Sequence, residues 1–352
     1  MSEPTTPSGN AAAIPESAPA VVTRSEPVSP IRRFLSGGVG RNLGLVIALL
    51  VIVAAGAITG GDRFSNLETL LTIIRYGSVI GVISIGMTFV ITAGGIDLSV
   101  GSVMGLSTVV ATLAGVQAAA DSSTWLLMVL VALVVGASAG LVNGVVVAYG
   151  RVVPFMATLA MLVAARGLAE LLSDKHTQII IVTDYLQFFR GDLLGIDWLI
   201  WFFAIAAAVG WFLLSRTTFG RRTVALGGNF EASRLAGLRV KRHTVMLYVL
   251  SGLAAGIAGV MMLGRTGVGT STHGTLYELD AIAAVVVGGT LLIGGRGTIM
   301  GTVLGVLIFA TLTNVFTQNN LSTSVQAIVK GVIIVVAVLL QQRFASRPGR
   351  SS

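Results

Sequence analysis

A polar loop within an otherwise apolar chain carries the residues best placed to make a chemical contact. The loop from Ser215 to His243 holds seven Arg and Lys residues and a single acid, Glu231. Asn229 is a favourable N-cap, and Glu231 follows in the first turn, where the helix dipole stabilises negative charge. Gly237 stands where a left-handed glycine ends a helix. The spacing predicts a short capped helix from Asn229 to Ala236.

The side chains of this helix are suited to a contact with another molecule and not to catalysis. Phe230 and Leu235 are apolar side chains on a short helix flanked by cations, with the small residues Ala232 and Ser233 between them. Two interpretations follow from the spacing. Either the helix contacts a soluble partner, or the loop is a basic segment that only orients a membrane protein.

A second group of polar residues lies between and within long apolar segments. Asp97 follows a pair of glycines and precedes Ser99, so its carboxylate either caps the next helix or lines a water-filled path. Asparagine and threonine within apolar segments form such paths, but they also make hydrogen bonds between helices. The candidate pathway residues are Gly94, Gly95, Asp97, Ser99, Asn143, Thr158 and Asn314.

The elements that must position these residues are membrane helices. Of the 352 residues, 54% are hydrophobic and 11% are charged, whereas a soluble domain carries about 25% charged residues. The mean hydropathy of +0.89 and recurrent long apolar runs predict an all-α polytopic membrane protein. About ten spans are predicted, some short or broken: 44–60, 70–92, 99–117, 125–148, 155–172, 198–214, 244–264, 281–293, 299–317 and 325–341.

The distribution of charge predicts the orientation. Ten spans place both termini on one side, and that side receives sixteen Arg and Lys residues, against four on the other. The positive-inside rule therefore predicts cytoplasmic N- and C-termini. Because the net charge of +8 is concentrated there, it does not indicate a nucleic-acid partner. The longest outer loop, 173–197, is a plausible landing surface for an extracellular protein.

Three segments are predicted along the chain. Residues 1–42, rich in Pro and Ser, cannot bury enough apolar surface to order themselves and form a disordered cytoplasmic tail. Residues 43–342 form the transmembrane domain, with the polar loop at 215–243, and 343–352 form a second cytoplasmic tail.

Few charged residues lie within the predicted spans. Arg166 and Glu170 are spaced to pair on one helix face, and Arg75 and Lys330 lie near span ends. There is no cysteine and only three scattered histidines, so no metal site is expected.

Two glycine-rich breaks share the pattern GG-x5-G-[ST]-V-[ML]-G, beginning at Gly94 and at Gly294. Paired interruptions in two halves of a transporter point to a substrate path. The predicted topology places both breaks on the same side of the membrane, whereas an inverted repeat would place them on opposite sides.

The residues around these motifs resemble a known family. GMTFVITAGGIDLSVGSVMGL at 86–106 is similar to the hallmark of permease subunits of bacterial ribose-type ABC importers. The segments at 154–169, 220–262 and 288–310 resemble the same family in the same order, so the likeness covers roughly 65–341. Residues 1–42 lie outside it. Glu231-Ala232-Ser233-x3-Gly237 resembles the family's EAA-x3-G coupling motif, with Ser233 where alanine is more usual.

The resemblance implies a permease that moves a sugar or sugar alcohol across the bacterial plasma membrane. It implies a second permease copy, separate cytoplasmic ABC ATPase subunits that use ATP, and an extracytoplasmic binding protein. It also implies that Asn229, Phe230, Glu231, Ala232, Ser233, Leu235 and Gly237 contact the ATPase. This chain would then hold no catalytic residue and no cofactor.

Three other classes remain open on the sequence. A related ABC permease would carry branched-chain amino acids or a furanose-like signal molecule. An ion-coupled secondary transporter would need a series of buried carboxylates, and a membrane enzyme would need a reactive cluster; neither pattern is evident in the sequence.

Overall fold

The computed structural model describes residues 38–64 and 66–345, and within them nearly every element is a helix. Most of the predicted tail at 1–42, and residues 346–352 at the other end, lie outside this part of the chain. The predicted boundary residues 38–42 and 343–345 belong to the first and last described helices. The long helices are α2 (Gly38–Gly60), α3 (Leu67–Thr92), α6 (Leu126–Ala148), α7 (Pro154–Ser173), α9 (Trp198–Arg216), α12 (Val240–Thr266), α14 (Ile299–Gln318) and α15 (Thr323–Ala345).

Shorter elements connect these helices. They are η1 (Gly61–Arg63), α4 (Val100–Ala111), α5 (Ala114–Ser122), α8 (Thr183–Arg190), α10 (Thr218–Gly228), α11 (Phe230–Leu235) and α13 (Tyr277–Val287). Two-residue strands pair antiparallel, β1 (Gln178–Ile179) with β4 (Val268–Gly269) and β2 (Asp192–Leu193) with β3 (Ile196–Asp197).

Within the described residues, seven helices are long and apolar enough to cross a membrane. An eighth span is counted if α4 and α5, which meet at a bend of 59°, are taken together. The predicted third span, 99–117, is therefore broken, because α4 ends at Ala111. The predicted short span at 281–293 corresponds to α13, which has only 11 residues. The all-α polytopic prediction is confirmed at this coarser level.

Helix α12 forms the centre of the fold, where it packs against α6, α3 and α4. The contact with α6 is unusually close because glycines face each other. A Cβ added at Gly140 or Gly252 would overlap a backbone oxygen of the facing helix. Small residues allow membrane helices to approach so that their backbones are in van der Waals contact. The core is thus a closely packed helix pair, and the break after α3 is joined to α12 through Asp97 and Ser251.

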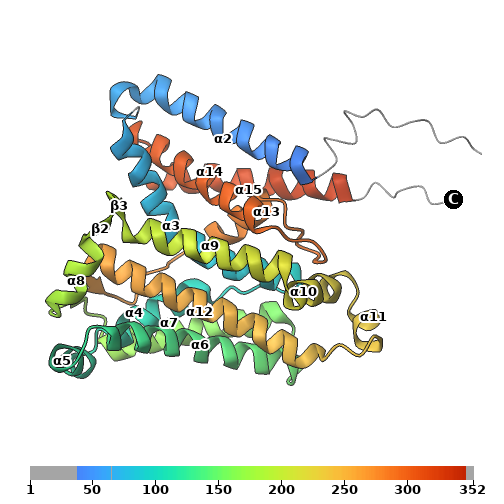
Figure 1. The fold of residues 1–352 in the computed structure, drawn as a ribbon, viewed down its shortest axis with the longest axis horizontal. Helices are drawn as coiled ribbons and strands as arrows, with labels where there is room; N and C mark the ends of the chain where they lie inside the picture. The colour runs from blue at the N-terminus through green and yellow to red at the C-terminus, as the bar shows by residue number, and fades with distance from the viewer. Residues whose placement is uncertain (1–37, 65, 346–352) are drawn as a thin grey trace, which may run out of the picture.

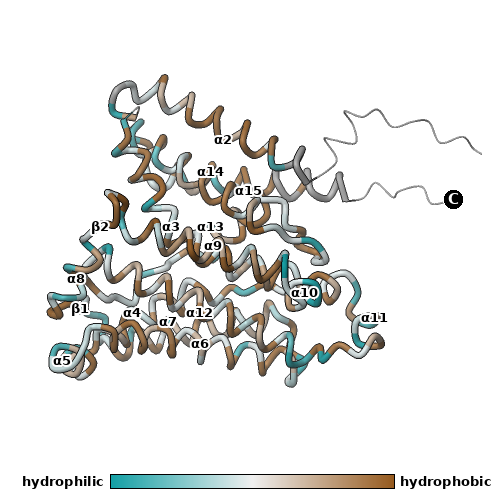
Figure 2. Tube along the Cα trace, in the orientation of Figure 1, coloured by the Kyte–Doolittle hydropathy of each residue, from teal (hydrophilic) through white to brown (hydrophobic). Residues whose placement is uncertain are grey.

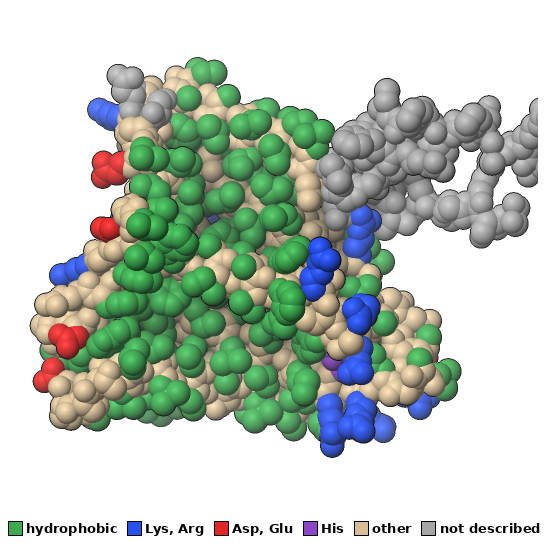
Figure 3. Space-filling view, viewed as in Figure 1, with side chains coloured by type: hydrophobic (Ala, Val, Ile, Leu, Met, Phe, Trp, Pro, Cys, Tyr) green, Lys and Arg blue, Asp and Glu red, His purple; other side chains and the backbone are tan. Residues whose placement is uncertain are grey.

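The two ends of the molecule differ in charge. Figure 2 shows apolar segments along the middle of the helices, and Figure 3 shows Arg and Lys gathered at the end that carries α10 and α11. We call this the basic end; its exposed cations include Arg216, Arg221, Arg222, Arg234, Arg239, Lys241 and Arg242. The opposite, acidic end carries the exposed side chains of Asp121, Asp174, Asp184 and Asp192.

Candidate functional site

The predicted capped helix is present as α11, at the edge of the basic end (Figure 1). The Asn229 side-chain oxygen accepts from the backbone N–H of Ala232 at 2.9 Å, as an N-cap does. At the other end Gly237 has φ +81°. Its N–H donates to Arg234 O at 3.0 Å, and the Leu238 N–H donates to Ser233 O at 3.1 Å. Both C-terminal bonds of a glycine-terminated helix are therefore made.

The surface of α11 is apolar where a solvated helix would be polar. Phe230 is 54% exposed and Leu235 is 79% exposed. Glu231 Oε2 pairs with Arg234, at 2.9 Å from Nη2 and 3.0 Å from Nε. Ser233 is the one buried residue of α11, so the small side chain in place of alanine faces the protein and leaves the exposed face unchanged.

The two glycine-rich breaks meet each other beside α10. The Gly295 N–H donates to the backbone oxygen of Thr92 at 2.9 Å. A Cβ on Gly294, which has φ +86°, would lie 2.8 Å from Gly94 N and 2.9 Å from Gly227 O. A Cβ on Gly227 would overlap the Thr92 oxygen and lie 2.5 Å from Gly295 N. We call Gly94, Gly227, Gly294 and Gly295 the glycine junction.

The glycine junction connects α11 to the core. Gly227 lies in the last turn of α10, and α11 begins three residues later at Phe230. Gly94 lies in the break after α3, and Gly294 lies in the break after α13. The breaks therefore lie together at the end of the molecule that carries α11, in agreement with the same-side placement predicted from the sequence.

Asp97 is buried and links helices through side-chain hydrogen bonds, which we call the Asp97 tie. Its side chain is 1% exposed. Oδ1 accepts from Ser99 N at 3.0 Å and from Ser99 Oγ at 2.6 Å, while Oδ2 accepts from Ser251 Oγ on α12 at 2.8 Å. Asn143 Nδ2 on α6 donates to Ser99 Oγ at 2.8 Å. The N-cap of α4 is Ser99 and it makes no side-chain cap bond, so Asp97 is not the N-cap itself. Its carboxylate accepts from the Ser99 N–H just before α4, and links the break to α12 directly and to α6 through Ser99.

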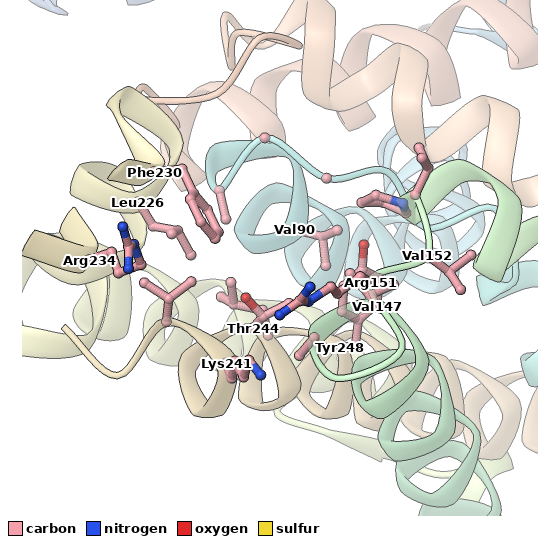
Figure 4. A pocket seen from close by; sticks show the side chains of 18 of the residues that line it. Val90, Val147, Arg151, Val152, Leu226, Phe230, Arg234, Lys241, Thr244 and Tyr248 are labelled. Carbon is pink, nitrogen blue, oxygen red and sulfur yellow. The ribbon is translucent and has the colours of Figure 1, made fainter. Parts of the chain in front are cut away.

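A cavity of about 640 Å³ lies between α11 and the region of the Asp97 tie. Figure 4 shows Phe230 and Leu226 on one side and Arg151 on the other, with Tyr248 from α12 below. Gly94 and Gly95 also line it. Tyr248 Oη is buried and has no hydrogen-bond partner among the described residues. The cavity extends from α11 to Gly94 and Gly95, which precede Asp97.

The candidate pathway residues do not form one site. Thr158 joins the Asp97 region, because its Oγ1 donates to Pro154 O at 2.9 Å and to Ile96 O at 3.3 Å. Asn314 lies elsewhere, in a second cavity bordered by α3 and α14. The sequence analysis missed Ser251 and Tyr248, and the only available signal was two polar residues spaced by three within the apolar α12.

The predicted pair of Arg166 and Glu170 does not form an ion pair in the described part of the chain. Arg166 Nη1 instead donates to the backbone oxygen of His273 at 3.0 Å. Burial, together with Arg265 and Arg166 nearby, lowers the pKa of His273 to about 4, so this loop imidazole is neutral at neutral pH.

Arg75 pairs with Asp197 at 2.9 Å, and Lys330 pairs with Asp280 at 3.2 Å. Each of these cations near a span end therefore has a partner.

Replacing Asp97 with alanine should destabilise the protein. Three donors would lose a buried acceptor, which costs about 2–4 kcal/mol. We expect a lower thermal unfolding midpoint of the purified protein and less protein in the membrane. Asp97→Asn is the control, because its amide can accept from Ser99 and donate to Ser251. An unchanged midpoint for Asp97→Ala would contradict the tie. Normal amounts but lost uptake for Asp97→Asn would instead favour a carboxylate that lines the path.

Comparisons with known proteins agree with the motifs. Residues 69–338 match the family model described as branched-chain amino acid transport system, permease component. The chain is 40% identical over 314 residues to the Bacillus subtilis ribose import permease protein RbsC, covering 89% of this chain and 96% of that protein. No solved structure matches.

Two further relatives are permeases for other sugars. The L-arabinose ABC transporter permease protein AraH of Azospirillum brasilense is 36% identical, covering 85% of this chain and 87% of that protein. The Escherichia coli galactose/methyl galactoside import permease protein MglC is 35% identical, covering 84% of this chain and 93% of that protein. Because both the family model and these relatives span most of the sequence, the chain belongs to the family of transport-system permease components that includes the permeases of ABC importers.

Proposed function

We propose that this chain is the permease subunit of an ABC importer that moves a monosaccharide or sugar alcohol into a bacterial cell. The relatives named for ribose, L-arabinose and galactose support the sugar class. The family description names branched-chain amino acids, which is the second candidate substrate class. The relatives aligned over nearly their whole length carry sugars in their names, so we favour the sugar.

The observation that carries this proposal is α11. It is a capped helix with exposed Phe230 and Leu235, it lies at the basic end, and it is joined to the glycine junction through α10. No GxxxxGK[ST] nucleotide-binding motif is present in the sequence. A transporter without this motif draws its energy from an ion gradient or from another polypeptide. We infer the second, because α11 has the shape and exposure of a contact with a cytoplasmic ATPase that binds and hydrolyses ATP.

The finer topology belongs to the same proposal. If α13, α15 and the bent pair α4–α5 each count as a span, the chain has ten spans with both termini in the cytoplasm of a bacterial cell. The charge difference between the basic and acidic ends supports this orientation. The acidic end, with α8 and its aromatic cluster of Trp125, Tyr185, Phe188 and Phe189, would then face the extracytoplasmic binding protein.

The transport step follows from this arrangement. Nucleotide-driven closure of the ATPases would move α11, and the glycine junction would pass that movement to the breaks after α3 and α13. Two permease copies would enclose the path, so that solute passes between them. A neutral solute needs no strong charge in the path, and the face shown in Figure 3 is mostly apolar between the two charged ends.

The experiment that tests the function is uptake by cells. A strain lacking only this gene should lose uptake of at least one of radiolabelled ribose, L-arabinose, D-allose or galactose, and a plasmid copy should restore it. Leucine uptake is the matched control and should be unchanged. Loss of leucine uptake with all four sugars unaffected would exclude the sugar assignment and favour the amino acid.

A further inference from the structure

A second cavity, of about 470 Å³, lies between α3, the end of α12, α13, α14 and α15. It is away from α11, toward the acidic end, because Arg265 at the end of α12 lines it. Small-molecule sites in proteins usually occupy ~300–1,000 Å³. The volume therefore suits a small solute, and none of the ties or docking contacts described above uses this cavity.

The polar groups of this cavity include two cations, one carboxylate and two phenols. Lys330 Nζ lies 3.2 Å and 3.3 Å from the two oxygens of Asp280, and both side chains are about four-fifths buried. The Arg265 guanidinium stacks over the Tyr76 ring at 5.0 Å. Tyr277, on the first turn of α13, adds a phenol to the same lining.

One atom of the lining lacks a partner. Asn314 Oδ1 is buried and accepts no hydrogen bond from any described residue. An unpaired buried acceptor is unfavourable, so a ligand hydroxyl group that reaches this oxygen would offset the penalty on binding. Phe309 and Val306, from the same helix, provide an apolar wall beside it, against which the C–H face of a ring can pack.

This set of groups favours a polyol over an anionic headgroup. A hydroxyl both donates and accepts, so it can serve the Asn314 oxygen and the Asp280 carboxylate as well as the donors of Arg265 and Lys330. A phosphate only accepts, and it would leave the Asn314 oxygen unpaired and be repelled by Asp280. We propose that this cavity binds a neutral polyhydroxy molecule of monosaccharide size within a single permease copy. The inference rests on the proposed sugar transport, and it adds a binding site inside the protomer.

The chain contains no cysteine, so one introduced thiol reports on its own position. Thr313→Cys places the thiol in the cavity lining, and Ser324→Cys, exposed at the start of α15, is the matched control outside it. The full-length protein in phosphatidylcholine vesicles is labelled with N-ethylmaleimide, with and without D-ribose, L-arabinose or D-galactose. We expect at least one sugar to slow labelling of Thr313→Cys about fivefold or more, and none to affect Ser324→Cys.

Asn314→Leu in the Thr313→Cys background should remove most of that protection. Because the change deletes an unpaired buried polar atom and keeps the side-chain size, it should not lower the amount of folded protein. Equal labelling with and without every sugar would overturn the proposal. Protection by added anionic phospholipid in place of sugar would also overturn it, and would assign the cavity to a lipid.

Uptake by cells separates this inference from the proposed function. If wild-type cells take up a sugar that fails to protect Thr313→Cys, the cavity proposal is wrong and the transport proposal stands. If a sugar protects the thiol in the absence of any sugar uptake, the cavity proposal stands and the transport proposal is wrong.

Discussion

Transport should fall at least tenfold when Gly237 is replaced by valine, while the protein stays in the membrane. Gly237 has φ +81°, and a left-handed backbone costs an L-residue roughly 1–2 kcal/mol, more for a β-branched one. A Cβ there would meet nothing within 4 Å, so the cost is conformational and not steric. Since α11 has only six residues, that cost is enough to open its last turn. The measurement is sugar uptake together with sugar-stimulated ATP hydrolysis by the assembled importer.

The matched control for this position is Gly237→Asn. Asparagine tolerates the left-handed conformation, so this variant should keep most of the uptake. Glu231→Lys should also abolish uptake, because it removes the ion pair with Arg234 and reverses the only negative charge on the docking face. The pair is well exposed, so its loss should hardly change stability. Wild-type uptake by both Gly237→Val and Glu231→Lys would remove α11 from the coupling role.

The second large effect should come from Gly227→Ala in the glycine junction. The added Cβ would overlap the backbone oxygen of Thr92 and crowd the N–H of Gly295. Backbone atoms cannot rotate away as a side chain can, so α10 must separate from both breaks, at a cost of roughly 3 kcal/mol or more. We expect a large loss of folded protein and of uptake, measured as the amount of detergent-soluble, monodisperse protein and as transport per cell.

The neighbouring glycine provides the control. A Cβ on Gly228 would meet nothing within 4 Å, so Gly228→Ala should resemble the wild type in amount and in uptake. If Gly227→Ala and Gly228→Ala behaved alike, close backbone contact at the junction would not be the reason for the glycine.

Local features of the site were accessible from the sequence. The caps of α11 involve residues three to five apart, so Asn229 and Gly237 could be assigned from spacing alone. The charge difference between the two ends is a compositional property, and it also survives in the structure (Figure 3). The helix class follows from long apolar runs, whose hydropathy does not depend on how they pack.

Contacts between distant parts of the chain could not be predicted from the sequence. The meeting of Gly94, Gly227 and Gly294 depends on how three separate helices end, and no periodicity encodes it. The same reason explains why Ser251, far along the chain, completes the Asp97 tie. Asn314 was grouped with Asp97 because both are polar residues in apolar surroundings, yet the structure places Asn314 in a different cavity. Arg166 was expected to pair along its own helix, but a loop carbonyl at His273 lies closer.

The most direct test is solute accumulation in vesicles with defined components. The chain is reconstituted with its ATPase and a binding protein. It should concentrate the cognate sugar on the side of the membrane that carries α11, and only when ATP is supplied on that side. The chain reconstituted alone should equilibrate the sugar at most, with or without an ion gradient. Uphill accumulation by the chain alone would contradict the claim that the energy for transport comes from a partner ATPase that contacts α11.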